Sequence, residues 1–265
     1  PTIKDGKKSI SNKKMTGTVE FQNVTFCYPG ADEPVIQNVT FEAQTGEVVA
    51  IIGRTGCGKS SILKLIPRLY DPTAGHILID GVDVRKYRLE ELRSLIGYVP
   101  QKNVLFSGDI ASNLNFGDEN GQETDWQEAV EIACAREFVV KKDGAYHAEI
   151  AQGGTNLSGG QRQRMAIARA VMKKPEIYLF DDSFSALDMK TDQELRANLK
   201  KYMRDATIIM VAQRGSSILN ADRILVVDHG KVVGNGTHAE LLQSCPLYRE
   251  IAVLQMGEEV VKNEN

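Results

Sequence analysis

Two short segments carry residue types and spacings that suit the binding of phosphate groups. The first, residues 53–60, reads Gly-Arg-Thr-Gly-Cys-Gly-Lys-Ser. Its glycines allow backbone N–H groups to curl around phosphate oxygens, Lys59 is expected to bridge the β- and γ-phosphates, and Ser60 is an expected Mg²⁺ ligand. The second, residues 157–161, reads Leu-Ser-Gly-Gly-Gln and opens a helix with a serine and bare backbone. That arrangement also suits an anion, so the sequence predicts two phosphate-contacting surfaces.

The composition excludes several classes of protein. A chain of 265 residues is long enough for one large core, and its formal net charge of −3 argues against a nucleic-acid-binding protein held by bulk electrostatics. No apolar run approaches the length of about 20 residues that a transmembrane helix needs, and no secretory signal is present. The four cysteines lack metal-ligand spacing, so we expect reduced cytosolic thiols.

Apolar spacing predicts the organisation of the N-terminal third. Residues 1–17 are rich in Lys, Ser, Thr and Gly and are interpreted as a linker from a preceding domain. Alternating apolar residues predict strands over 19–26 and 35–43, which indicates an antiparallel β lobe. The apolar run 47–52 predicts a buried strand leading into the glycine-rich loop, and 60–69 has helical spacing.

Helices and strands alternate over the rest of the chain. Residues 108–142 are predicted to be mostly helical, without a strand, inside an inserted helical lobe of about 102–172. Further elements are predicted as a helix capped by Ser158, strands at 177–180, 207–211 and 223–227, helices at 192–203 and after Thr237, and a flexible tail at 257–265. Alternating elements around a glycine loop favour an α/β fold with a parallel sheet and a ligand at the carboxyl ends of its strands.

A third motif points to a metal ion. The apolar segment 177–180 predicts a buried strand, and Asp181 stands at its end. Such a strand places a carboxylate beside a phosphate-binding loop, where it holds Mg²⁺, usually through water.

With these motifs together, the chain resembles the ATP-binding-cassette (ABC) ATPases from Thr18 to about Gln255. Leu-Ser-Gly-Gly-Gln is the signature that separates this family from other phosphate-loop NTPases. The resemblance implies a P-loop NTPase (RecA-like) core, the N-terminal antiparallel β lobe, the inserted α-helical lobe, and ATP with Mg²⁺ as ligands. It also implies that two such domains pair head to tail, each nucleotide lying between one glycine loop and the other domain's signature.

The resemblance assigns further roles residue by residue. Tyr28 resembles the aromatic residue that stacks on adenine, Gln101 the glutamine that senses Mg²⁺ or the attacking water, and Asp188 the loop residue that touches the opposite domain. The residues expected to bind nucleotide are Tyr28, Gly53, Arg54, Thr55, Gly56, Cys57, Gly58, Lys59, Ser60 and Ser61. Those expected to act in trans are Leu157, Ser158, Gly159, Gly160 and Gln161. The expected metal ligands are Ser60, Gln101 and Asp181.

One segment narrows the resemblance to a branch of the family. Residues 105–110, Leu-Phe-Ser-Gly-Asp-Ile, are similar to the exporter branch, in which the motor domain follows its own transmembrane domain. The chain begins at Pro1 without a methionine, so we expect it to be a fragment of a longer polypeptide. Residues 149–154 occupy the place of the exporter loop that contacts the membrane domains, but their sequence departs from the Glu-rich pattern that is usual there. The resemblance implies a position on the cytoplasmic face of the membrane.

Two positions depart from the family pattern. The residue after the Mg²⁺ aspartate is normally a glutamate that polarises the attacking water, but here it is Asp182. The shorter side chain withdraws the carboxylate by roughly 1.5 Å, and a general base must come within about 3 Å of its proton. Gln213 stands where the family has a histidine at the γ-phosphate, and a glutamine cannot become an imidazolium.

These departures indicate a chain that binds Mg-ATP well and hydrolyses it poorly in its own site, at the expected catalytic residues Asp182, Gln213 and Gln101. Because the signature is intact, we expect a heterodimer with a second half-transporter motor domain, similar to heterodimeric bacterial multidrug exporters. Three alternatives stay open: a homodimeric exporter or an importer motor with slow turnover, a regulatory module that clamps ATP, and a soluble ABC protein of DNA repair or translation.

Overall fold

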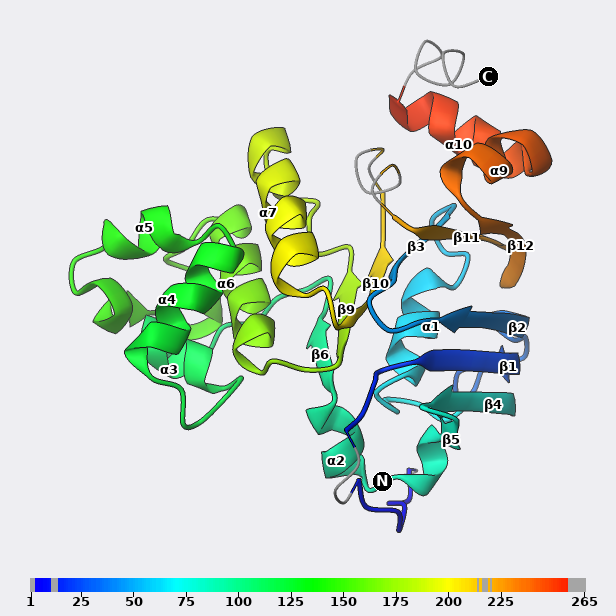
Figure 1. Cartoon of the computed structure of the whole chain (residues 1–265), viewed down its shortest axis with the longest axis horizontal. Helices are drawn as coiled ribbons and strands as arrows, with labels where there is room; N and C mark the ends of the chain where they lie inside the picture. The colour runs from blue at the N-terminus through cyan, green and yellow to red at the C-terminus, as the bar shows by residue number, and fades with distance from the viewer. Residues whose placement is uncertain (1–2, 11–13, 214, 216–218, 220, 257–265) are drawn as a thin grey trace. The chain divides into compact units, whose positions relative to one another are not determined.

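The computed structural model describes residues 3–10, 14–213, 215, 219 and 221–256 (Figure 1). They form two compact units. The first comprises the described residues within 3–96 and 205–256, and the second comprises residues 97–204. The predicted tail, 257–265, lies outside the described residues.

An antiparallel β lobe opens the first unit, and this confirms the predicted lobe. Its strand order is β2-β1-β4-β5, with β1 (Val19–Phe26), β2 (Ile36–Ala43), β4 (Ala74–Ile79) and β5 (Val82–Asp83). In β1 the apolar side chains alternate inward, and the buried Phe21 stacks on Phe41 of β2 with ring centroids 4.6 Å apart. Cross-strand aromatic pairing of this kind stabilises the register of the two strands.

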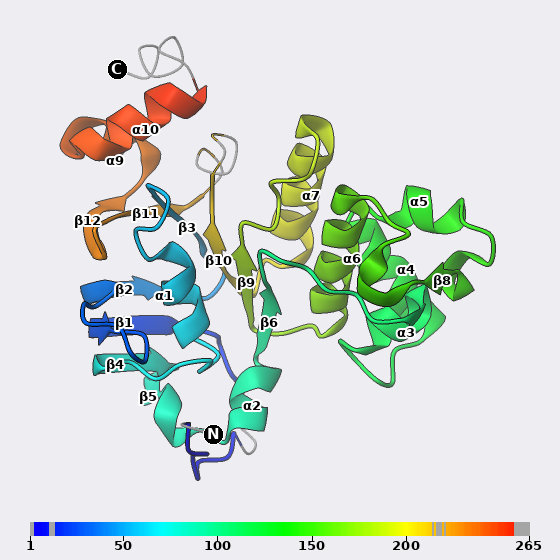
Figure 2. The same ribbon diagram turned by 180° about the vertical axis from the view of Figure 1, so that it is seen from behind.

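Parallel strands form the core of the first unit. The strand β3 (Val48–Gly53) pairs in parallel with β10 (Thr207–Val211) on one side and with β11 (Arg223–Asp228) on the other, and β12 (Lys231–Gly236) closes the order antiparallel to β11. The Val- and Ile-rich strands β3, β10 and β11 are largely buried, as expected for strands covered on both faces. Figures 1 and 2 both show α1 (Lys59–Leu65) beside the antiparallel β lobe. They also show α9 (His238–Ser244) and α10 (Pro246–Met256) near the β11–β12 hairpin.

The described part of the predicted linker hydrogen-bonds to residues 86–89 of the same unit. The N–H of Lys8 donates to the carbonyl of Lys86 at 2.8 Å, and the N–H of Arg88 donates to the carbonyl of Lys8 at 3.0 Å. The carboxylate of Asp5 accepts from the N–H of Leu89, the first residue of α2 (Leu89–Ser94), at 2.7 Å. Residues 3–10 therefore run along the segment that leads into α2, and their role as a linker stays a prediction.

The second unit contains the span predicted as a helical lobe. Its helices are α3 (Ile110–Asn115), α4 (Glu123–Ile132), α5 (Arg136–Val140), α6 (Gly159–Met172) and α7 (Met189–Tyr202). Two strands, β9 (Ile177–Asp181) and its neighbour β6 (Ile96–Val99), lie beside these helices in the chain's second unit. Ile96, the first residue of β6, is assigned to the first unit, and the rest of β6 to the second. The unit is thus wider than 102–172 because β9 and α7 are part of it.

One local expectation about this lobe was wrong. Residues 108–142 contain a two-residue strand, β7 (Gly108–Asp109), which pairs with β8 (Glu149–Ile150). A strand of two residues is too short to produce an alternating pattern, so periodicity cannot detect it. Among the described residues, no helix is long and apolar enough to cross a membrane.

The stacked pair Phe21–Phe41 gives a test of the β lobe. We expect Phe21→Ala to lower the free energy of unfolding by about 3–5 kcal/mol, because it removes a fully buried ring and leaves a cavity. Glu42→Ala on the exposed face of β2 is the matched control and should change it by less than about 0.5 kcal/mol. Urea unfolding of the two variants measures both, and equal midpoints would contradict the assigned packing.

Candidate nucleotide-binding and hydrolytic site

The glycine-rich loop joins the end of β3 to the start of α1, as predicted. Gly53 has a φ of +150°, and a Cβ placed on it would lie 2.1 Å from the carbonyl oxygen of Val227. Gly58 has a φ of +104°, and a Cβ there would lie 2.8 Å from the carbonyl oxygen of Val35. Only glycine satisfies both the left-handed backbone and the close approach. The loop is therefore held in a bare-backbone arch of the kind that wraps phosphate oxygens.

Lys59 lies inside this loop. Its side chain is buried, and its Nζ donates to the carbonyl oxygens of Gly53 and Arg54, each at 2.8 Å. The Sγ of Cys57 lies 3.8 Å from the same nitrogen. An ammonium group held at this position supplies positive charge where phosphate oxygens would enter, and the loop carbonyls keep it in place.

Tyr28 is held by contacts on two sides. Its ring packs edge-on against Phe26 and Tyr70, with centroids 4.7 Å and 5.1 Å away. Its hydroxyl is hydrogen-bonded to the Oγ of Ser61 in α1 at 3.0 Å. The structure thus brings together two residues predicted to contact nucleotide, and it links the predicted adenine platform to the helix that follows the glycine loop.

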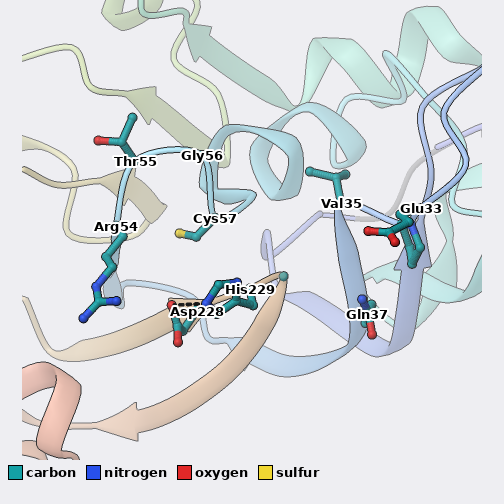
Figure 3. Close-up of a pocket in the computed structure, with 11 residues that line it drawn as sticks. Glu33, Val35, Gln37, Arg54, Thr55, Gly56, Cys57, Asp228 and His229 are labelled. Carbon is teal, nitrogen blue, oxygen red and sulfur yellow. Dashed lines mark ion pairs between the residues drawn. The ribbon is translucent and has the colours of Figure 1, made fainter.

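A pocket of about 400 Å³ lies beside the glycine loop (Figure 3). On one side are Arg54, Thr55, Gly56 and Cys57, and on the other are residues 33–35 and 37 and the tip of the β11–β12 hairpin at 228–230. The hairpin is fixed to the loop because the N–H of Gly230 donates to the carbonyl of Cys57 at 3.2 Å. Arg54 also pairs with Glu250 of α10 at 3.2 Å, but both groups are more than half exposed, so this pair contributes little stability.

Asp181 ends β9 in the second unit. Its side chain is buried, and the hydroxyl of Tyr98 donates to its Oδ2 at 3.4 Å. The predicted position of the carboxylate at the end of a buried strand is therefore found in the structure. Among the described residues, no group of three or more His, Cys, Asp or Glu side chains is arranged to hold a metal ion. A hard cation such as Mg²⁺ held by one carboxylate, a hydroxyl and phosphate oxygens needs no such cluster.

The next residue, Asp182, has an unusual backbone and an engaged side chain. Its φ is +50°, a left-handed value that few residues other than glycine, asparagine and aspartate adopt, and its side chain is buried. The Nε2 of Gln101 donates to its Oδ2 at 3.2 Å. The structure thus brings two of the three predicted catalytic residues together. The third, Gln213, lies two residues beyond β10 in the first unit and is exposed.

The segment 157–161 forms the start of α6. Ser158 is the N-cap, and its Oγ accepts from the N–H of Gln161 at 3.2 Å while Gln161 Oε1 accepts from the N–H of Ser158 at 3.0 Å. This reciprocal capping box fixes the first turn of the helix. Leu157 is buried, which anchors the turn, and Gly159 and Gly160 leave the backbone bare. The predicted capped helix is therefore present.

Asp188 and Gln163, which lie near these motifs, both accept hydrogen bonds from backbone N–H groups. Asp188 is the N-cap of α7 and accepts from the N–H and hydroxyl of Thr191 at 3.0 and 2.7 Å, which lowers the pKa of its carboxyl. Gln163, which sequence analysis left without a role, accepts a hydrogen bond from the N–H of Ala186 at 3.1 Å. The signal that could have found it is a polar residue on the buried side of an Ala-rich helix.

The glycine geometry and the buried Lys59 fit a nucleoside triphosphate, and comparison with known proteins identifies the family. The family profile of ABC transporters matches residues 36–185. The chain belongs to the ABC transporter family. The match includes the glycine-rich loop, the signature and the pair Asp181–Asp182, and the chain is an ATP-binding domain of this family.

The chain is similar to curated ABC proteins and to a solved structure of an ABC exporter. The chain is 52% identical over 244 residues to an uncharacterized ABC transporter ATP-binding protein of Mycobacterium tuberculosis, covering 91% of this chain and 42% of the relative. It is 40% identical over 255 residues to the ATP-dependent lipid A-core flippase of Salmonella paratyphi A, covering 96% and 44%. A solved structure of a bacterial Atm1-family ABC exporter with ATP bound aligns with a TM-score of 0.89 at 36% identity, over 96% of this chain and 44% of that one. The chain thus spans less than half the length of these proteins, and its fold is that of an exporter ATP-binding domain.

The position of Lys59 gives a test of nucleotide binding. We expect Lys59→Met to weaken the affinity for Mg-ATP by roughly 10- to 100-fold, because hydrogen bonds to charged groups contribute about 1.5–3 kcal/mol each. Lys64→Met, in the same helix, removes a similar charge outside the loop and should leave the affinity unchanged. Isothermal titration with Mg-ATP measures the dissociation constants. An equal loss in the two variants would rule out a specific role for Lys59.

Proposed function

We propose that this chain is the motor domain of an ABC exporter whose own hydrolytic site is degenerate. In this proposal, it pairs head to tail with a second half-transporter motor domain around Mg-ATP. Its glycine loop, with Tyr28, supplies one composite site, and its signature completes the partner's site. Family membership supports ATP binding and hydrolysis coupled to transport as the general activity.

The observation that carries the proposal is the environment of Asp182. Its carboxylate stands on a side chain one methylene shorter than glutamate, and its Oδ2 already accepts a hydrogen bond from Gln101. A carboxylate acts as a general base only within about 3 Å of the proton or through one water. A withdrawn carboxylate with its orientation set by Gln101 is therefore poorly placed to activate water.

The third catalytic position supports the same conclusion from different chemistry. Gln213 offers an amide that donates a hydrogen bond but carries no positive charge at any physiological pH. A histidine at this position would become an imidazolium on taking a proton, and so stabilise the negative charge that develops during phosphoryl transfer. Nucleotide binding does not require that charge, because Lys59 and the loop backbone supply the electrostatic attraction.

We further propose that the second unit contacts the transmembrane domain of the same transporter at the cytoplasmic face of the membrane. Phe106 and Phe116 are exposed, with ring centroids 4.4 Å apart, and Val104 beside them is also exposed. Arg169 orders this patch: its guanidinium lies 5.6 Å from the Phe106 ring, and its Nη2 donates to the carbonyl of Val104 at 3.0 Å. An exposed apolar cluster indicates a protein contact. The relatives are more than twice as long as this chain, which leaves room for such a domain in them.

The degenerate site predicts a gain of activity on restoration. We expect the isolated chain to bind Mg-ATP but hydrolyse it slowly, and Asp182→Glu with Gln213→His to raise the turnover number at least tenfold, since general-base catalysis contributes roughly 10²- to 10⁴-fold. The matched control, Asp118→Glu with Gln127→His, makes the same changes at exposed positions and should have no effect. Phosphate release assays measure all three proteins.

Three outcomes separate the alternatives. Wild-type turnover at the rate of the restored variant would eliminate the degenerate site and favour a homodimeric exporter. Slow turnover that a candidate partner motor domain stimulates supports the heterodimer. Slow turnover with no gain from restoration would favour a regulatory module that clamps ATP.

The aromatic patch predicts a defect in coupling. In the full-length transporter, Phe106→Ser with Phe116→Ser should lower substrate-stimulated ATP hydrolysis and transport at least fivefold while Mg-ATP binding to the isolated domain stays unchanged. Val140→Ser removes another exposed apolar side chain of the same unit and serves as the control. Substrate-stimulated hydrolysis and transport at the wild-type level in the double variant would rule out this contact.

A further inference from the structure

The buried amide of Gln163 connects two segments that the proposed function places in different composite sites. Gln163 lies in the second turn of α6, downstream of the signature, and the residue is 7% exposed. Its Oε1 accepts from the N–H of Ala186 at 3.1 Å. Ala186 belongs to the loop 183–188, which runs from the hydrolytic residue Asp182 to the start of α7. A buried amide with this bond satisfies a backbone N–H that no regular element serves.

The start of α6 also touches this loop directly. A Cβ on Gly160 would lie 3.1 Å from the carbonyl oxygen of Ala186 and 3.6 Å from the side chain of Leu187. On Gly159 it would lie 3.8 Å from the Cβ of Ala186. The bare backbone of the signature therefore serves a second purpose besides exposing N–H groups, because it allows α6 and the loop to approach closely.

The loop is rigid from its other end as well. The hydroxyl of Ser185 donates to the carbonyl of Asp182 at 3.1 Å, and that of Ser183 donates to the carbonyl of Val99 at 2.9 Å. The ring of Phe184 is buried, with the guanidinium of Arg196 lying 4.3 Å from its centroid. Arg196 is itself paired with the buried Asp192 at 2.9 Å. A displacement of Ala186 therefore moves the backbone of Asp182, because packing and hydrogen bonds hold residues 183–185 between them in place.

We propose that Gln163 is a positioning residue that fixes the loop 183–188, and through it Asp182, to the signature helix. A shift of the signature then moves the hydrolytic residue of the same chain. The consequence for two nucleotides rests on the proposed function: a signature that contacts the partner's nucleotide reports that contact to Asp182 through Gln163. The connection between Gln163 and the loop 183–188, called the clamp below, does not rest on the proposed function. All of its contacts lie within the second unit of one chain.

Amide hydrogen exchange in the isolated chain tests the clamp without nucleotide. Gln163→Leu removes the acceptor at similar volume, and we expect the Ala186 amide to exchange about tenfold faster. Gln163→Glu keeps an oxygen that accepts from this N–H and should restore slow exchange. Met165→Leu, a volume-conserving change at a buried position of the same helix, should leave the exchange of 183–188 unchanged.

A double-variant cycle tests transmission from the signature. Ser158→Ala removes the cap of α6, and we expect it to raise the exchange of amides 183–188 by about threefold when Gln163 is present. In the Gln163→Leu background it should add less than half as much, because only the direct approach of Gly159 and Gly160 to Ala186 then connects the helix to the loop. Equal effects of Ser158→Ala in both backgrounds, no effect in either, or failure of Gln163→Glu to restore protection would each overturn the inference.

Turnover of the restored chain gives a second readout. In the isolated chain that carries Asp182→Glu with Gln213→His, Gln163→Leu should lower kcat for ATP about fivefold and leave KM unchanged, because residue 182 then acts on water while the glycine loop and Tyr28 are untouched. An equal rise in KM, or an unchanged kcat, would contradict a positioning role. The exchange cycle is independent of hydrolysis, so the clamp stands or falls whether or not Asp182→Glu with Gln213→His restores activity.

Discussion

The geometry of the glycine-rich loop is the constraint on which the nucleotide site depends. Gly53 ends β3, the strand between β10 and β11, and its Cα lies so close to Val227 of β11 that a Cβ would approach the carbonyl oxygen to 2.1 Å. The parallel sheet therefore determines where the loop starts. Lys59 then closes the loop from inside by donating to two of its carbonyls. Side chains that would strengthen the sheet locally are excluded at Gly53, since the loop needs bare backbone there.

A different constraint governs the second unit, where polar side chains hold irregular backbone in place. The signature turn is closed by Ser158 and Gln161, the loop after Asp182 by Gln163 and Ser185, and the start of α7 by Asp188. Each of these side chains hydrogen-bonds to a backbone group in a loop or in the first turn of a helix. Residues with a proposed chemical role are thus also structural, so a substitution at any of them changes geometry as well as chemistry.

Much of this architecture could be predicted from the sequence because its signals are local. The alternation in 19–26, the apolar run before Gly53 and the cap at Ser158 each depend on residues within one element, and the corresponding strands and helix are present. The strand Gly108–Asp109 was missed because two residues carry no period. The bonds Gln101–Asp182 and Gln163–Ala186 join residues 81 and 23 positions apart, and no spacing rule relates such distant positions. The positive φ of Asp182 was likewise not predicted, because aspartate tolerates this backbone region without requiring it.

The left-handed backbone at Asp182 bears on why a degenerate site would keep an acidic residue. A positive φ is less costly for aspartate than for glutamate, because a short polar side chain tolerates this region better. The carboxylate also accepts from Gln101, so a non-polar replacement would remove this contact. Aspartate therefore preserves the local conformation and the Gln101 contact while giving up reach toward water. The hydrogen bond from Gln101 depends on the carboxylate, whereas the reach toward an attacking water depends on the length of the side chain. Aspartate therefore keeps the hydrogen bond and shortens the reach.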